Sequence, residues 1–167
     1  MSQLIFDIET IGEDFDTLDE TTQDVLTRWL KQTSHTDTEY EAALKDLKAG
    51  LGFSPLTGQI VAIGVIDGQK EQGCVYFQAP GEDIKDFEEN NIKYRCMTEK
   101  DMLQKFWELA SRYNEFVTFN GRSFDVPFLV VRSAVNKVKP TKDLLSNRYM
   151  NLQKFNAKHV DLFDQLT

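Results

Sequence analysis

The sequence has few of the features that mark secreted or membrane proteins. Its 167 residues include only two cysteines, Cys74 and Cys96, and neither has a second cysteine or a histidine at a zinc-binding spacing. This excludes a disulfide framework and a zinc knuckle. No apolar run approaches the roughly eighteen residues of a membrane helix, and the N-terminus lacks the basic and apolar regions of a signal peptide. We therefore expect no membrane segment and a cytoplasmic location.

Positive charge is also scarce. The chain has 19 Lys and Arg against 27 Asp and Glu, a formal net charge of −8, which argues against a general nucleic-acid coat protein. The imbalance is uneven: residues 1–50 hold twelve acids and four bases, whereas residues 121–160 hold eight bases and two acids. The basic third would suit a phosphate-facing surface beside an acidic metal site, or simply a solvated face, and both interpretations stay open.

The residues that are present indicate one α/β domain. The hydrophobic content of 41% and charged content of 28% are ordinary globular values, and the length suits one buried core. Apolar and β-branched runs predict strands at residues 4–10, 59–66, 74–78, 115–119 and 159–163. Apolar residues at helical spacing predict helices over residues 21–32, 37–48, 98–110 and 125–137. Residues 79–97 are expected to form a loop.

The first predicted strand carries two acidic residues. Asp7 and Glu9 are two positions apart, so on a strand they project from one face, while Phe6 and Ile8 project from the other. Two like charges this close are costly unless a cation, typically a divalent metal, compensates them. The alternative is an exposed polar face of an ordinary strand.

A second motif follows the strand predicted at residues 115–119. Asn120 and Gly121 stop this strand, and Asp125 with Pro127 suits the start of a helix, because proline is tolerated in the first helical turn. A simple helix N-cap would explain Asp125 equally well.

Together, Phe-Asp-Ile-Glu-Thr at residues 6–10 and Phe-Asn-Gly-Arg-Ser-Phe-Asp-Val-Pro-Phe-Leu at residues 119–129 resemble the first two motifs of the DEDD superfamily of 3′-5′ exonucleases. The match is closest to the exonuclease domain of family B DNA polymerases. The resemblance implies a ribonuclease H-like α/β fold with a mixed five-stranded sheet flanked by helices. It covers nearly the whole chain, 1–167, as a single exonuclease-like domain in which residues 13–50 form a helical insert after the first strand.

The resemblance also implies a chemistry. Asp7, Glu9 and Asp125 would be catalytic and would bind two Mg²⁺ or Mn²⁺ ions, which support in-line hydrolysis of a phosphodiester bond. The expected substrate is a nucleic acid with a single-stranded 3′ end, with DNA the expected form, although the sequence does not separate DNA from RNA. A polymerase, replication or repair partner stays open. The implied substrate-binding residues are Thr10, Ile11, Asn120, Arg122, Ser123 and Phe124.

Two features of this resemblance stay open. Phe124 suits a base-stacking role and a core role equally well. The family's third motif, Tyr-x3-Asp or His-x4-Asp on a C-terminal helix, has no convincing match. His159 and Asp164 have the second spacing, but residues 159–163 are more typical of a strand, and the few residues after them are too short for a stable helix. We therefore expect the catalytic helix to be missing from these 167 residues, with weak metal binding and slow or no hydrolysis.

Two alternatives remain. The first is a nuclease-derived module that binds nucleic acid or a protein partner without cleaving it. The second is an unrelated α/β protein with a coincidental pair of motifs, which would place Asp7, Glu9 and Asp125 far apart.

Overall fold

The computed structural model describes residues 2–166, which form two compact units. The sheet unit comprises Met1–Glu9 and Ile60–Thr167, and the helical unit comprises Thr10–Gln59. The helical segment expected at residues 13–50 lies within the helical unit. In the part of the chain that the structure describes, no helix combines the length and the apolar character that crossing a membrane requires.

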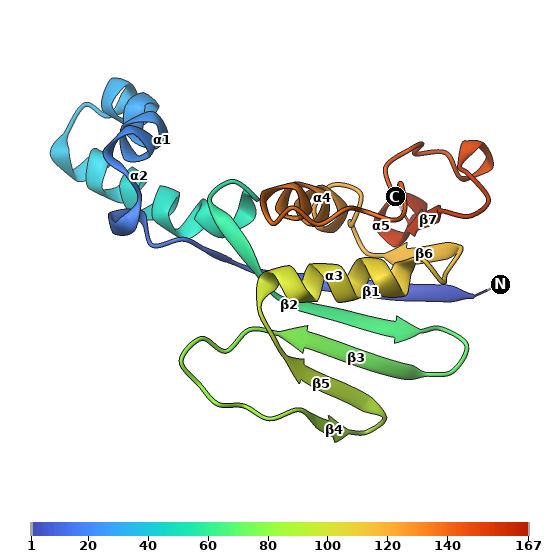
Figure 1. Cartoon of the computed structure of the whole chain (residues 1–167). Helices are drawn as coiled ribbons and strands as arrows, with labels where there is room; N and C mark the ends of the chain where they lie inside the picture. Colours follow the sequence, from blue (N-terminus) through green and yellow to red (C-terminus); the bar gives the residue numbers. More distant parts are fainter. Residues whose placement is uncertain (1, 167) are drawn as a thin grey trace. The chain divides into compact units, whose positions relative to one another are not determined.

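The sheet unit is built on a mixed seven-stranded sheet in the order β4-β5-β3-β2-β1-β6-β7 (Figure 1). The β2–β3 pair is an antiparallel hairpin, whereas β6 runs parallel to both β1 and β7. The predicted α/β class and mixed sheet are confirmed, with two strands more than the five expected. The strands are β1 (Gln3–Gly12), β2 (Gly58–Asp67), β3 (Gln72–Phe77), β4 (Phe87–Glu89), β5 (Ile92–Cys96), β6 (Glu115–Thr118) and β7 (Lys158–Asp161).

The additional strands β4 and β5 lie in residues 79–97, and the prediction of a loop there was wrong. The two strands pair antiparallel across Asn90 and Asn91, whose φ angles of 50° and 65° are those of a two-residue hairpin turn. The rings of Phe87 and Tyr94 stack across the pair with centroids 4.5 Å apart. The prediction failed because β4 is short and exposed throughout, so it has no apolar alternation, and Asn-Asn is a weaker hairpin signal than Asn-Gly.

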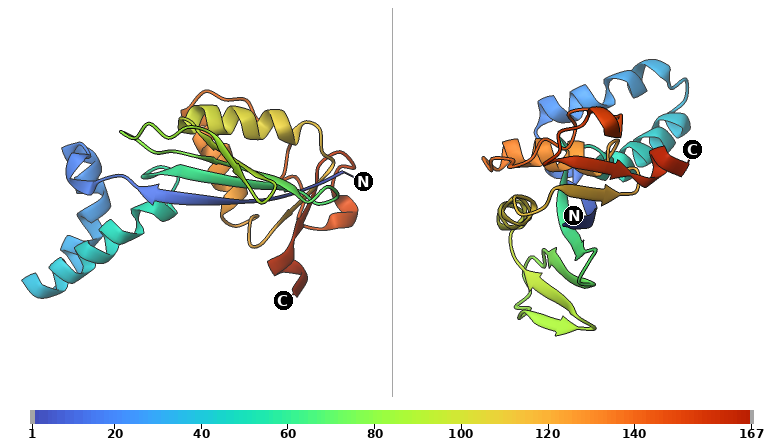
Figure 2. Two further views of the ribbon diagram at one scale, coloured as in Figure 1. Left: turned by 90° about the horizontal axis from the view of Figure 1, so that it is seen from below. Right: turned by 90° about the vertical axis from the view of Figure 1, so that its right-hand side faces the viewer.

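Two helices cover one face of this sheet, and a short third helix lies toward the other face (Figure 2). The covering helices are α3 (Glu99–Ala110) and α4 (Asp125–Val135), joined by a 2.8 Å hydrogen bond that the Trp107 indole donates to the Ser133 hydroxyl. The short helix is α5 (Leu162–Leu166), and a 3-10 turn, η3 (Met150–Leu152), precedes β7. The core between the sheet, α3 and α4 includes Leu4, Phe6, Ile8, Ile63, Met102, Phe106, Phe116, Val126 and Leu129.

A buried ion pair fixes the start of α3. Glu99 accepts hydrogen bonds from Arg132 of α4, at 2.7 and 2.8 Å, and from the backbone N–H of Ile60 at 2.8 Å. Burial opposes the charge on Glu99, but these bonds and one from Asn136 hold its pKa below the ordinary value. The contacts of Glu99 with Ile60 of β2 and Arg132 of α4 therefore hold β2, α3 and α4 together.

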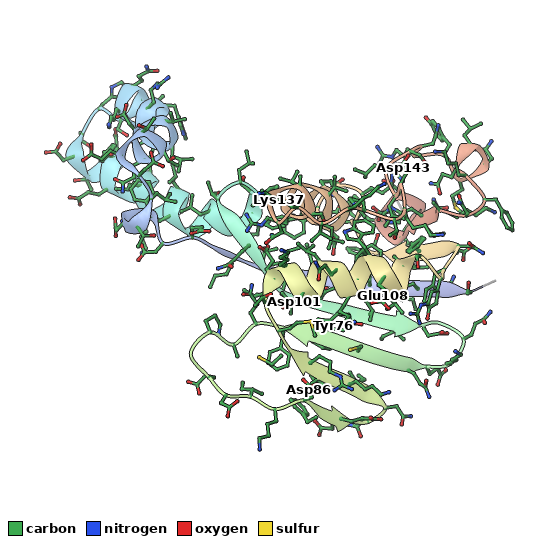
Figure 3. The ribbon with its side chains drawn as sticks, viewed as in Figure 1. Tyr76, Asp86, Asp101, Glu108, Lys137 and Asp143 are labelled. Atoms are coloured by element: carbon green, nitrogen blue, oxygen red, sulfur yellow. The ribbon has the colours of Figure 1, made fainter. Side chains whose placement is uncertain are left out.

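Further along, α3 packs on β3, and Figure 3 shows Tyr76 of β3 beneath this helix.

The helical unit contains α1 (Glu20–Thr33) and α2 (Asp37–Gly50), with 3-10 turns η1 (Phe15–Thr17) and η2 (Leu51–Phe53). Both helices were predicted from their apolar spacing. Each begins at a capping side chain: Asp19 accepts from the N–H of Thr22, and Thr36 accepts from the N–H of Glu39. The N-cap bonds satisfy backbone donors that an α-helix leaves unpaired at its first turn.

Candidate functional site

The acidic residues of the first motif lie on the face of the sheet opposite α3 and α4. Along β1, Leu4, Phe6 and Ile8 are buried in the core, whereas Asp7 and Glu9 are exposed. The predicted alternation is therefore confirmed. It results from the two-residue repeat of a strand, which places every second side chain on the same face.

Asp125, the acid of the second motif, lies at the first residue of α4 and is only 3% exposed. Strands β1 and β6 pair in register only as far as Ile5 and Val117. Beyond that point, the backbone N–H of Ile8 donates to Asp125 Oδ1 at 3.0 Å. The start of α4 thus places a carboxylate beside β1, and this carboxylate accepts a backbone N–H of β1 beyond the last residue pair of β1 and β6.

Asp125 is not the N-cap of α4, which was the alternative explanation of this residue. The N-cap position is Phe124, without a side-chain cap bond, so capping does not explain Asp125. Burial and then the negative charge of Asp7 raise the pKa of Asp125 to about 6, against a lowering effect of the Ile8 hydrogen bond. Asp7 and Asp125 therefore lie close enough to interact directly. Two carboxylates that raise one another's cost of ionisation at a helix start favour either a shared proton or a bound cation.

The structure brings two of the three predicted acids together. Residues 2–166 contain no group of three or more His, Cys, Asp or Glu side chains positioned to hold a metal ion. Glu9 shares the strand face of Asp7 but does not complete such a group. The donor chemistry of Asp7 and Asp125 nevertheless fits a divalent cation, because carboxylate oxygens are the ligands that Mg²⁺ and Mn²⁺ prefer.

A tight turn between β6 and α4 carries the predicted substrate-binding residues Asn120, Arg122 and Ser123. Asn120 has a left-handed φ of 60°, and a Cβ atom on Gly121 would lie 2.3 Å from the Thr118 hydroxyl oxygen, so only glycine fits there. Ser123 is exposed and donates its N–H to the carbonyl of Asn120 at 3.1 Å. This geometry explains the Asn-Gly sequence without reference to substrate.

Asp161, at the end of β7, holds this turn, and sequence reasoning missed its role. Its buried carboxylate accepts from the backbone N–H groups of Asn120 at 2.7 Å, Arg122 at 2.9 Å and Phe163 at 3.1 Å. The only sequence signal is one acid inside the short apolar run that ends the chain. Hydrogen bonds to an ionised carboxylate are stronger than those between neutral groups, so these three bonds hold the backbone of the turn against the end of β7.

The remaining predicted residues lie in three different settings. The Arg122 guanidinium donates to the carbonyl oxygens of Leu144 and Leu145 at 3.3 and 3.5 Å. Phe124 is half-buried against the core, its ring centroid 5.5 Å from that of Phe128. Two further residues belong to the helical unit: Thr10 donates to the carbonyl of Gly52 at 2.8 Å, and Ile11 is exposed.

An apolar groove of about 340 Å³ adjoins Asp7 on the face of the sheet opposite α3 and α4. Phe119, which is 60% exposed, packs edge-to-face on Phe163 with ring centroids 5.8 Å apart. The volume of the groove is typical of small-ligand sites. The side chains that line it include Ile5, Asp7, Ile66, Val117, Phe119 and Leu162.

The strand predicted at residues 159–163 ends at Asp161, and α5 follows it, so the expectation that no helix forms there was wrong. His159 lies in the strand and Asp164 in the short helix. His159 lies in β7, 1% exposed, with one ring nitrogen 3.0 Å from the Leu144 carbonyl and the other 2.7 Å from the Thr118 hydroxyl. Burial lowers its pKa, against the effect of the Leu144 bond. Asp164 forms an ion pair with Arg148. Both side chains are thus engaged in contacts with other residues.

The mixed sheet and the helices that flank it define an α/β domain with a ribonuclease H-like fold. A family model described as "Predicted 3'-5' exonuclease related to the exonuclease domain of PolB" matches residues 57–167. The chain belongs to this family. The matched region contains Asp125 but not the first motif with Asp7 and Glu9.

The structural comparison agrees. The chain is similar to the family B DNA polymerase from the hyperthermophilic archaeon Pyrobaculum calidifontis, with a TM-score of 0.51 and 15% sequence identity. The similarity covers 99% of this chain and 16% of the polymerase chain, so it shows the fold alone. The comparison with curated proteins gives no match.

Proposed function

We propose that the chain is a metal-dependent 3′-5′ exonuclease domain that acts on single-stranded nucleic-acid ends, with DNA as the expected substrate. The observation that carries this proposal is the position of the Asp125 carboxylate beside β1, where it accepts the backbone N–H of Ile8 at 3.0 Å, one residue from Asp7. The negative charge of Asp7 also contributes to the raised pKa of Asp125. In this proposal Asp7 and Asp125, with Glu9 on the same strand face, bind two Mg²⁺ or Mn²⁺ ions. Bound ions of this kind activate water and neutralise the charge of the departing oxygen.

The residues around the acids support a nucleotide site in several ways. The backbone turn at Asn120 and Arg122 is held rigidly by Asp161, so its position relative to α4 is fixed. The groove beside Asp7 offers an apolar surface with the exposed ring of Phe119, which suits stacking with a base. Phe124, which is half-buried and packs against the core, is better suited to positioning Asp125 than to stacking. In this proposal Ser123 remains a candidate for substrate contact.

A second candidate function is a module that binds nucleic acid without cleaving it. The absence of a three-residue metal group among residues 2–166 favours this alternative. Weak metal binding by two carboxylates would leave hydrolysis slow, whereas the groove and the basic C-terminal third would still bind a single strand.

One experiment separates the two candidates. The chain is incubated with 5′-labelled single-stranded DNA and Mn²⁺, and the products are resolved by denaturing electrophoresis while binding is measured by fluorescence anisotropy. Exonuclease activity predicts stepwise shortening from the 3′ end that Asp7→Ala abolishes and the exposed control Asp83→Asn leaves intact. Binding without shortening supports the second candidate. Shortening that Asp7→Ala and Asp125→Ala leave unchanged contradicts the proposed site. The same assay with RNA tests the preference for DNA.

A further inference from the structure

The helical unit buries few side chains for its size. Among the described residues of α1 only Thr27 and Leu30 are buried, and in α2 none is. Helices in proteins gain most of their stability from packing an apolar face rather than from intrinsic propensity. Much of the apolar surface of these two helices is therefore available for further packing.

This surface is concentrated in a groove of about 450 Å³ between α1 and α2. Trp29 lines the groove and is 60% exposed, and Val25, one turn before it on α1, is 55% exposed. Exposed apolar surface of this kind often marks a protein interface, and tryptophan is enriched among the hot-spot residues that contribute most of the binding energy there. Five aliphatic side chains complete the apolar lining: Leu26, Leu30, Ala43, Leu47 and Leu51.

The charge around the groove indicates what it would bind. Residues 10–59 contain ten acids and four bases. Two of the bases are engaged within the unit, because Lys31 pairs with Asp24 at 2.6 Å and Lys48 pairs with Asp16 at 2.8 Å. Asp46 lies in the wall of the groove itself. The field around the apolar lining is therefore negative and is complementary to a basic partner.

We propose that the groove between α1 and α2 docks a basic amphipathic helix of a partner protein. The apolar stripe of that helix would pack on Trp29 and its aliphatic neighbours, and its Lys or Arg residues would face the acids at the rim. A helix laid into a groove is an established mode of peptide recognition. This inference is independent of the proposed nuclease site, because every residue it uses belongs to the helical unit.

The test uses the two tryptophans of the full chain, which differ in accessibility. Trp29 is 60% exposed and Trp107 is 1% exposed, so acrylamide should quench Trp29 alone in the free chain. The probe is an 18-residue amphipathic helix of leucine and lysine, and the control peptide has the same composition in an order without an apolar stripe. Binding of the probe should protect Trp29 from quenching and shift its emission to shorter wavelength, whereas the control peptide should bind at least about tenfold more weakly.

Two charge-reversal variants make the test specific. Asp46→Lys should weaken binding of the probe at least about fivefold, and salt should weaken it further. Glu82→Lys makes the same change of net charge on the sheet unit, at an exposed residue, and should leave binding unchanged. Circular dichroism and the unquenched emission of Trp107 confirm that each variant is folded.

Three results would overturn this proposal. Trp29 already protected in the free monomer would mean that the rest of the chain covers the groove. A dimer that dissociates on Trp29→Ala would mean that a second copy occupies it. Equal binding of the two peptides, or equal effects of Asp46→Lys and Glu82→Lys, would mean that attraction is merely electrostatic.

Discussion

Replacing Asp125 by asparagine should stabilise the protein at neutral pH. The raised pKa of Asp125, about 6 against an ordinary 3.8, means that the folded state binds this proton more tightly than the unfolded state does. The stability of the wild type therefore falls as pH rises from about 4 to about 6 and does not recover above that. Asparagine removes the charge that Asp7 repels, and its Oδ1 still accepts the Ile8 N–H bond.

The size of the effect follows from the pKa. Each tenfold change in the acid dissociation constant is worth about 1.4 kcal/mol, so the gain of Asp125→Asn should approach about 3 kcal/mol at pH 7.5. At pH 4.5, where Asp125 is largely protonated in the folded state, the same linkage leaves a gain of about 1 kcal/mol. Other titrating groups, including His159, contribute to both proteins and cancel in the difference.

The assay is urea unfolding of both proteins at pH 4.5 and pH 7.5 without divalent cations, followed by circular dichroism. Asp83→Asn, at an exposed position, serves as the control and should change stability little at either pH. A stability difference between Asp125→Asn and wild type that is the same at both pH values would refute the inference that Asp125 is a buried carboxylate facing Asp7.

Three further substitutions test contacts that hold the site, each by urea unfolding. Glu99→Gln should destabilise by about 3 kcal/mol, because it leaves the mostly buried Arg132 without its counter-charge, and a loss below about 1 kcal/mol would contradict that role. Gly121→Ala should cost about 2 kcal/mol or more, since its Cβ would lie 2.3 Å from the Thr118 hydroxyl, and a neutral effect would mean that the turn adapts freely. Asp161→Asn should cost about 1–2 kcal/mol through weaker bonds to the backbone of the turn, and unchanged stability would remove Asp161 as its clamp.

The sequence predicted what depends on local pattern. The alternation along β1 and the helix start at Asp125 both follow from short-range rules, so the faces of Asp7 and Glu9 and the place of Asp125 in the chain were predictable. The resemblance to exonuclease motifs added the expectation that these acids meet. The contact of Asp125 with β1 itself depends on where β1 and β6 stop pairing, which is a property of the assembled sheet.

The missed features depend on long-range contacts or on weak local signals. Asp161 acquires its role from a turn about forty positions earlier in the chain, and no spacing rule connects the two segments. The β4–β5 hairpin has an exposed first strand and an Asn-Asn turn, so neither hydrophobic periodicity nor the strongest turn signal marks it. Glu99 was expected only within the first turn of α3, and its pairing with Arg132 is likewise tertiary.

The central claim is that Asp7 and Asp125 together attract a divalent cation, and Mn²⁺ binding tests it most directly. Free Mn²⁺ is measured by electron paramagnetic resonance during titration of the wild type, Asp7→Asn, Asp125→Asn and the control Asp83→Asn at pH 7.5. We predict that the wild type and Asp83→Asn bind Mn²⁺ equally, and that each of the other two variants binds about tenfold more weakly or worse. Equal binding by all four proteins would contradict the claim.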